Sequence, residues 1–440
     1  MKPAFDFTAT KGSISLSQGE VSVCIGGSTY IGTGNVCLDL LPRAGINFYA
    51  DLMGVPNSVG LALEVYFGKK EVTSFCFNGH DVEGFLMSAG GHENTQVMAI
   101  KWSPKSEPIR GLGDESTLVT RVVFHLFNFV DLFGMRRSLE QNGSAIHAIQ
   151  YVDLVSDKWK VALRSLVETR DNFNLLKANG GYCITHIGRL WKADATTFPA
   201  REAQEQLDAL RFFLSFAKGG WCEPVCAVGF DETGNRVWES WSSPRESWHN
   251  PPSWFDPYSS TQLATLFGGF MSRWAHSDWR GALHEVIYWY LNANHSSRGI
   301  DAGIILTQAA IERLSYELAV KQKRLLTVNG FKDLWASDKF RLLFSSLGIP
   351  IEIPLETPEL QRLAKEFNWA DAPHALTEIR NSLVHPENKR RGQLDAAYYE
   401  AWELGLWYLE MGVLAICGYS GTYGNRLKKR MVGQTENVPW

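Results

Sequence analysis

Residues 242–260 read SSPRESWHNPPSWFDPYSS, and this stretch separates two parts of the chain that differ in character. It holds four prolines and six serines without helical or strand periodicity, a composition typical of linkers. Strand-like segments dominate before it, and helix-like segments follow it. We therefore predict a β-rich N-terminal domain over residues 1–241, with room for two subdomains, a Pro/Ser-rich linker over 242–260 and a helical domain over 261–440.

The part before the linker is dominated by β-type sequence from about residue 5 to residue 166. Glycine turns at Gly26-Gly27 and at residues 68–70 suggest hairpins, so an antiparallel sandwich or barrel-like sheet is expected. One helix interrupts this region, at about residues 199–217, where leucines recur at helical spacing. The strand candidates are residues 13–25, 60–67, 71–77, 118–129, 224–230 and 235–241, the last two joined by a hairpin at 231–234.

The part after the linker has helical periodicity almost throughout, with short connections typical of an up-and-down bundle. We expect a multidomain α+β protein in which an antiparallel β-rich domain precedes an all-α bundle. Residues 404–424 contain a single charge, Glu410, but a buried bundle helix has the same appearance, so no membrane span is predicted. The expected helices are residues 261–275, 280–294, 299–323, 331–347, 357–367, 372–385 and 393–417.

Composition excludes several classes of protein. The chain has 440 residues, 45% hydrophobic and 20% charged, which is ordinary globular usage with room for two or three domains. The net charge of −4 excludes a uniformly basic nucleic-acid binder but leaves room for a local basic patch. Neither a signal peptide nor an anchor is recognised at the amino end, and seven scattered cysteines suggest reduced thiols, so a cytoplasmic protein is expected.

The chemistry-bearing motif is the stretch RNSLVHP, residues 380–386. Pro386 disfavours helical backbone at the residue before it, so a helix is expected to end at His385. Asn381 and His385 are four residues apart and share a helix face, where the amide can orient the imidazole. Arg380 precedes Asn381 and can reach the same cleft if its side chain bends around the turn.

A fixed guanidinium beside an oriented imidazole suits RNA transesterification. Arg380 would hold the non-bridging oxygens of the scissile phosphate and stabilise the charge that builds there. His385 would take the proton of the ribose 2′-hydroxyl or give one to the leaving 5′ oxygen, so neither a metal nor a cofactor is required. An Arg and a His at this spacing are common by chance, so their place at a helix end matters more than the spacing.

At these residues the chain resembles the HEPN superfamily, whose signature is an Arg, a polar residue, a few variable positions and a His. The stretch around Gln308 and Glu312 is similar to the earlier HEPN helix whose acidic residue supports the active site. This resemblance, over about residues 260–420, implies a homodimer in which two Arg/His pairs face one cleft and cut RNA, such as tRNA or viral transcripts, to leave a cyclic phosphate. The overall layout resembles ApeA-type anti-phage proteins.

Taken with this resemblance, the sequence predicts a metal-independent endoribonuclease in anti-phage defence, with the N-terminal domain sensing a trigger such as a phage product. Lys389, Arg390 and Arg391 follow the motif and are expected to contact the RNA backbone. A second basic group, Arg426, Lys428, Lys429 and Arg430, has the same potential. Tyr398, Tyr399 and Trp402 offer rings for base stacking, although Trp402 is a core candidate.

Other interpretations remain open at this point. Arg380 can simply pair with Glu378, His385 can be a helix-end histidine, and Glu312 can be an ordinary surface carboxylate. The alternative function is a non-catalytic HEPN module that dimerises or binds nucleotides, beside a ligand-binding β domain. A third is a carbohydrate-binding sandwich with a helical dimer domain. The zinc-protease motif fails because Tyr288 stands where the second histidine belongs after His284.

Overall fold

The computed structural model describes residues 1–7, 12–91, 95–133, 136–141, 144–259, 261–295, 299–385, 387 and 392–440. Contacts among them divide the chain into two compact units that are discontinuous in sequence. Residues 129–167 and 205–223 of the predicted N-terminal domain belong to the second, mainly helical unit. The first unit is Met1–Asn128, Glu168–Gln204 and Pro224–Trp248, and the second is Phe129–Val167, Glu205–Glu223 and His249–Trp440.

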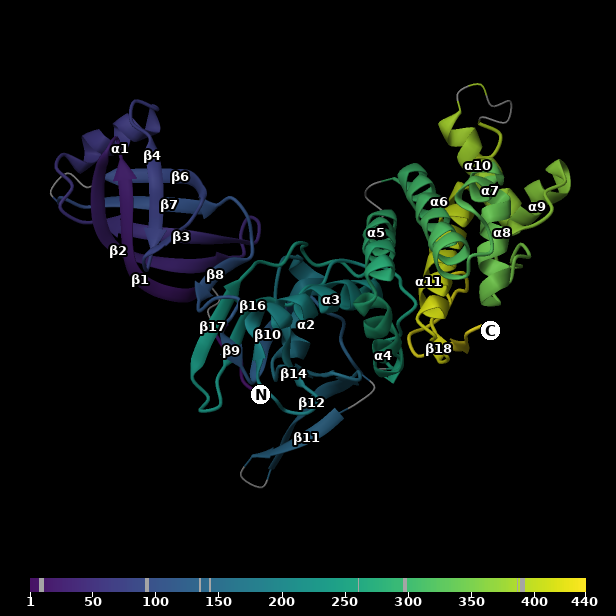
Figure 1. Ribbon diagram of the computed structural model, residues 1–440, viewed down its shortest axis with the longest axis horizontal. Helices are drawn as coiled ribbons and strands as arrows, with labels where there is room; N and C mark the ends of the chain where they lie inside the picture. Colours follow the sequence, from purple (N-terminus) through teal and green to yellow (C-terminus); the bar gives the residue numbers. More distant parts are fainter. Residues whose placement is uncertain are drawn as a thin grey trace. The chain divides into compact units, whose positions relative to one another are not determined.

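The first unit contains a seven-stranded antiparallel sheet with the order β5-β4-β1-β2-β3-β7-β6 (Figure 1). The predicted hairpin at Gly26-Gly27 is confirmed, since it joins β1 to β2. Side chains alternate along each strand, so one face of the sheet holds the core residues and the other is exposed. The strands are β1 (Ser13–Ile25), β2 (Ser28–Asp39), β3 (Gly45–Leu52), β4 (Val72–Phe77), β5 (His80–Asp81), β6 (Gly84–Gly91) and β7 (Met98–Pro104).

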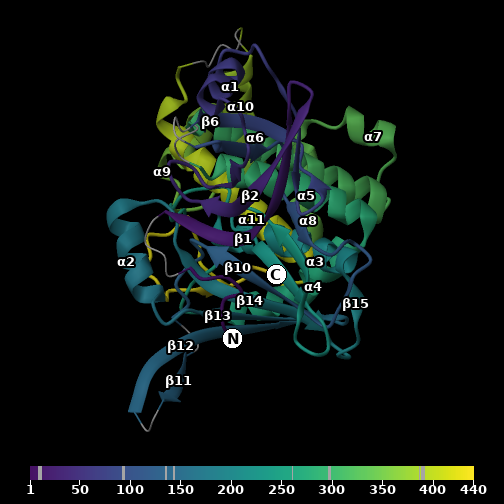
Figure 2. The ribbon, with the colours of Figure 1, turned by 90° about the vertical axis from the view of Figure 1, so that its left-hand side faces the viewer.

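The predicted strand at residues 60–67 is wrong, because this stretch lies in helix α1 (Ser58–Tyr66). Asn57 caps the helix by accepting a hydrogen bond from the Gly60 backbone N–H at 3.2 Å. The buried positions Leu61, Ala62 and Val65 fit a helical stripe against β6, beside which α1 lies in Figures 1 and 2. Residues 68–70 therefore join a helix to β4 rather than two strands.

A second set of antiparallel strands in the first unit has the order β14-β10-β16-β17-β8. The predicted hairpin at residues 231–234 is confirmed between β16 and β17. Helix α3 (Ala200–Lys218) matches the predicted helix, whereas α2 (Thr169–Asn179) was not predicted. The strands are β8 (Ile109–Leu112), β9 (Leu118–Val119), β10 (Arg121–Phe127), β14 (Ile184–Lys192), β15 (Phe198–Pro199), β16 (Val225–Phe230) and β17 (Arg236–Trp241), and β9 pairs with β15.

The second unit combines three antiparallel strands with a helical bundle. Helix α6 is central, since it packs against α5, α8, α10 and α11. The strands are β11 (Arg136–Gln141), β12 (Ser144–Val155) and β13 (Trp159–Ser165), and two short strands near the end are β18 (Thr422–Tyr423) and β19 (Glu436–Asn437). The α-helices are α4 (Thr261–Ala275), α5 (Ser277–Ala293), α6 (Ile300–Tyr316), α7 (Val328–Asp333), α8 (Ala336–Leu347), α9 (Pro358–Phe367), α10 (Ala372–Val384) and α11 (Tyr398–Ile416).

The helical predictions are confirmed with small differences. The predicted helix 299–323 is α6 followed by a π-helical segment, Glu317–Gln322. The predicted helix 331–347 is two helices, α7 and α8, because the backbone is extended at Leu334 and Trp335. The chain is therefore a multidomain α+β protein with antiparallel sheets followed by a mostly helical region.

Part of the predicted linker is packed rather than exposed. Trp254 has no exposed surface, Phe255 is 4% exposed and Asp256 has none. The Trp254 indole donates to the Phe216 carbonyl at 3.2 Å, which binds the segment to the end of α3. Its prolines and serines thus make an irregular but buried segment, whose large aromatic side chains outweigh the local linker composition.

Among the described residues, the structure contains no helix that is both long enough and apolar enough to span a membrane. The apolar run considered above forms most of α11, whose side chains are buried in the bundle. This agrees with its interpretation as a core helix.

Candidate ribonuclease site

Helix α10 carries the RNSLVHP motif, and local sequence explains both of its ends. Asp371 caps the start by accepting from the His374 backbone N–H at 2.9 Å, and Pro373 occupies the first turn. At the other end His385 has extended backbone dihedrals, φ −106° and ψ 107°. The helix therefore ends at the residue before Pro386, as predicted.

The Arg380 side chain folds toward Asn381. Its Nη1 donates to Asn381 Oδ1 at 3.3 Å. This contact brings the guanidinium beside Asn381, which lies four residues before His385. Arg380 is partly exposed, so the guanidinium remains accessible to a ligand.

The imidazole of His385 is open to solvent, with 51% of its side chain exposed. Its Nδ1 lies 3.8 Å from a Glu387 carboxylate oxygen. Among the residues that the structure describes, no hydrogen bond joins the Asn381 amide to the imidazole, so the predicted role of Asn381 in orienting His385 is not seen. Asn381 instead holds Arg380.

Glu312 does not lie with this pair. Gln308 of α6 donates to the Leu376 carbonyl at 2.5 Å, and Tyr398 lies near both Ser382 of α10 and Asp301 of α6. The two helices therefore run in opposite directions, which places Glu312 about 20 Å along the axis from His385 at 1.5 Å per residue. Its carboxylate pairs with Lys339, with Nζ and Oε1 2.6 Å apart.

Acidic groups near the end of α10 come from elements that are distant in sequence. Burial raises the pKa of Tyr398, the hydrogen bond with Ser382 lowers it, and Asp395 and Asp301 raise it. These four residues lie on α6, α10 and the segment that enters α11. The sequence analysis singled out Tyr398 but missed the other three, since no local pattern links positions 301, 382 and 395.

Two groups of basic residues were expected to contact RNA. Lys389, Arg390 and Arg391 lie outside the described residues, and their role stays a prediction. In the tail group, Arg426 and Arg430 are engaged within the protein, because the Arg426 side chain has no exposed surface and Arg430 pairs with buried Asp256 at 3.0 Å. Lys428 and Lys429 are exposed, and their contact with RNA stays a prediction. A buried guanidinium loses its hydration, and the carboxylates that pair with Arg426 and Arg430 offset that cost.

The aromatic residues near the motif differ in how far they are buried. Trp402 is 7% exposed and donates from its indole to the Ala293 carbonyl at 2.7 Å, which confirms it as a core residue. Tyr399 is 58% exposed and remains available for stacking.

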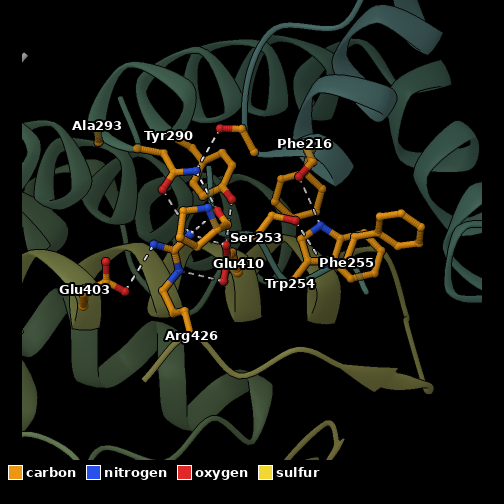
Figure 3. A network of polar contacts seen from close by, with 12 residues as sticks. Phe216, Ser253, Trp254, Phe255, Tyr290, Ala293, Glu403, Glu410 and Arg426 are labelled. Carbon is orange, nitrogen blue, oxygen red and sulfur yellow. Dashed lines mark hydrogen bonds and ion pairs between the residues drawn. The ribbon is translucent and has the colours of Figure 1, made fainter. Parts of the chain in front are cut away.

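Arg426 lies at the centre of a buried polar network (Figure 3). Its guanidinium binds both carboxylate oxygens of Glu410, at 2.7 and 3.1 Å, and Nη1 lies 3.5 Å from Glu403. Burial opposes the charge of Arg426, but Glu410, Tyr290 and Glu403 raise its pKa above the ordinary value. The Tyr290 hydroxyl donates to Glu410 at 2.6 Å. With Glu410 fully buried, this network is structural.

Two potential metal ligands of the same unit, His249 and His295, have ring centroids 4.9 Å apart and are partly buried. The chemistry available to Arg380 and His385 involves neither histidine.

Comparisons with known proteins match most of the chain to one family. Residues 276–437 match the YopA C-terminal domain, and residues 114–251 match the YopA central domain. The chain is 31% identical over 372 residues to the SPbeta prophage-derived uncharacterized protein YopA of Bacillus subtilis (strain 168), covering 82% of this chain and 81% of the relative. No solved structure matches the chain.

Proposed function

The chain belongs to the YopA family, and from this premise and the geometry of α10 we propose that it is a metal-independent endoribonuclease acting at Arg380 and His385. One observation carries the proposal. The Arg380 guanidinium bonds to Asn381, on the helix face that ends in the half-exposed His385 imidazole. A cation and a proton-transfer group are thus available together at one solvent-facing helix end.

The guanidinium would bind the scissile phosphate. Its planar fork matches two non-bridging oxygens and favours the extra negative charge of the pentacoordinate transition state. Asn381 occupies one N–H of Arg380 and so positions the guanidinium, whose other donors bond to no residue that the structure describes and can meet a phosphate. Asn381 therefore acts on Arg380 rather than on the imidazole.

His385 would transfer the proton. The ribose 2′ oxygen attacks phosphorus, the bond to the 5′ oxygen breaks, and the products are a 2′,3′-cyclic phosphate and a 5′-hydroxyl. One proton leaves the 2′ oxygen and one reaches the 5′ oxygen. A single imidazole cannot be base and acid at the same moment. The second proton-transfer group would be His385 of another copy of the chain, in the expected homodimer.

The cellular setting follows from the relative and the resemblance together. The Bacillus subtilis relative is described as prophage-derived. That origin, with the similarity to anti-phage HEPN proteins, favours a cytoplasmic nuclease that cuts tRNA or phage transcripts during infection. The first unit would then sense the trigger, a phage product.

The test is cleavage of total RNA by the purified full chain in EDTA. We expect cutting with cyclic-phosphate ends, lowered at least about 100-fold in His385→Ala and Arg380→Ala, the usual scale for general acid–base catalysis. Asn381→Ala should lower cleavage less than either, because it only frees the guanidinium. End-group analysis of the RNA products distinguishes this chemistry from metal-dependent hydrolysis.

Matched controls are His276→Ala and Arg362→Ala, exposed residues of the same unit. Both should cut like the unchanged protein. Cutting that persists in His385→Ala and Arg380→Ala would refute the site. Dimerisation without any cutting would favour the non-catalytic alternative.

A further inference from the structure

The seven-stranded sheet of the first unit carries a hollow of about 760 Å³ that crosses five neighbouring strands. Five side chains form a single row across it. Successive members of the row are direct register partners on adjacent strands, so they share one face of the sheet. The row consists of Gln18 on β1, Asn35 on β2, Tyr49 on β3, Lys101 on β7 and Ser88 on β6.

This row lies on the face of the sheet that points away from the core. The residues that alternate with it point to the core, such as Phe48, 1% exposed, and Ile100, 3% exposed. A second row on the same face lies two residues away from the first along each strand. It contains Thr33, Asp51 and the small residues Ala99 and Gly90. A Cβ atom added at Gly90 would meet no atom within 4 Å, so the groove is open there.

The charge in the groove is already compensated within the protein. Asp39 accepts from the Tyr49 hydroxyl at 2.5 Å and pairs with Lys101 at 3.2 Å, while Asn47 also donates to it at 2.7 Å. The hydrogen bond with Tyr49 is the largest contribution to the raised pKa of Lys101, so the ammonium is retained. Because Asp51 also lines the groove, the lining has no excess of positive charge. Such a lining disfavours the binding of anions such as RNA.

We propose that this groove binds a neutral oligosaccharide. Five strands spaced about 4.8 Å apart extend for about 20 Å, which is room for several sugar rings. The amides of Gln18 and Asn35 and the hydroxyl of Ser88 can donate and accept, as sugar hydroxyls require. Tyr49, at the centre of the row, has the Lys101 ammonium 5.0 Å from its ring centroid and is 37% exposed, so the exposed part of its ring can meet the apolar face of a sugar.

The test is binding of the full chain to arrayed neutral oligosaccharides of glucose, mannose, galactose and N-acetylglucosamine, with heparin fragments and poly-uridylate as anionic probes. Calorimetry on the retained glycan then gives its affinity. We expect Tyr49→Ala and Gly90→Phe each to weaken binding by about tenfold or more, the first by removing the ring and the second by filling the groove.

The matched control is Tyr66→Ala, an exposed tyrosine of α1, 76% exposed, outside the groove lining. Its affinity should stay within about twofold of the unchanged protein. Thermal denaturation verifies that each variant is folded. The assignment is overturned if no neutral glycan is retained, if retention survives Gly90→Phe, or if the anionic probes bind instead. None of these outcomes depends on RNA cleavage, so a failure of the glycan proposal would not count against the proposed nuclease, and the reverse also holds.

Discussion

His125 and His385 occupy opposite environments. His125 on β10 has no exposed surface, and its Nε2 accepts from the Ala4 backbone N–H at 3.0 Å. Its Nδ1 donates to the Cys226 carbonyl at 3.1 Å, so both nitrogens are used by one neutral tautomer. Burial is the main reason that its pKa is lowered to about 4. His385, by contrast, has 51% of its side chain exposed.

Two buried histidines make the first unit sensitive to acid: His125, and His186, whose pKa is lowered by burial to about 3. Above the unfolded pKa near 6.5, His125 is neutral in both states and has no effect on stability. As the pH falls from 6.5 toward 4, only the unfolded chain takes up the proton at this position, so His125 by itself lowers stability by about 3 kcal/mol at most. We expect His125→Gln, which keeps a donor and an acceptor without titrating, to flatten this loss. Urea unfolding at pH 7.5 and pH 5 measures it, and equal pH slopes in both proteins would contradict it.

At the scale of elements, α10 depends on a contact that the motif itself does not contain. Asp371 caps the helix and also binds Arg341 of α8 through both oxygens, at 2.5 and 3.0 Å. The hydrogen bond with Asp371 is the largest cause of the raised pKa of Arg341. One carboxylate therefore both starts the helix that carries Arg380 and His385 and attaches it to the bundle.

Replacing Asp371 separates these two roles. We expect Asp371→Ala to lower the free energy of unfolding by about 2–3 kcal/mol, because the cap and the ion pair are both lost. Asp371→Asn keeps a capping oxygen and should cost about half as much. Thr327→Ala, at the cap of the short helix α7, is the matched control and should cost about 1 kcal/mol or less. Urea unfolding followed by far-UV circular dichroism compares them, and similar losses for Asp371→Ala and Thr327→Ala would contradict the double role.

Elements also show where local sequence is a reliable guide. The helices after residue 260 were predicted because their apolar stripes repeat over three or more turns. Residues 60–67 were mistaken for a strand because this short, mostly apolar stretch has no clear period, and a cap at Asn57 with packing against β6 decided for a helix. Short segments follow their neighbours more than their own propensity.

At the scale of the whole molecule, the buried Arg426 joins segments that are far apart in the sequence. It binds Glu410 of α11, the Pro252 carbonyl at 3.0 Å and the Asn294 side chain at 3.2 Å. Figure 3 shows Arg426 reaching toward Glu410 on one side and Glu403 on the other. The network ties the carboxyl-terminal segment, α11, the end of α5 and the segment around residue 252 into one unit.

Breaking this network should be costly. We expect Arg426→Ala to destabilise the second unit by about 3–5 kcal/mol, since Glu410 would be left charged and buried. The double variant Arg426→Leu with Glu410→Leu should cost less than Arg426→Ala, because no uncompensated charge remains. Lys428→Ala removes an exposed pair with Glu436 and should change stability by less than about 1 kcal/mol. Urea unfolding ranks the three, and an Arg426→Ala loss as small as that of Lys428→Ala would contradict the role.

The sequence alone determined the β-rich and helical regions, the hairpins at Gly26-Gly27 and residues 231–234, and a helix end at His385, because these depend on periodicity and on glycine and proline geometry over a few residues. Tertiary structure decided that Asn381 bonds to Arg380, that Glu312 lies toward the other end of α10, that Arg426 is buried, and that Tyr49 and Lys101 share a groove. Those outcomes depend on which elements pack together and on the free-energy cost of burying an unpaired charge between them. A local sequence pattern contains neither kind of information.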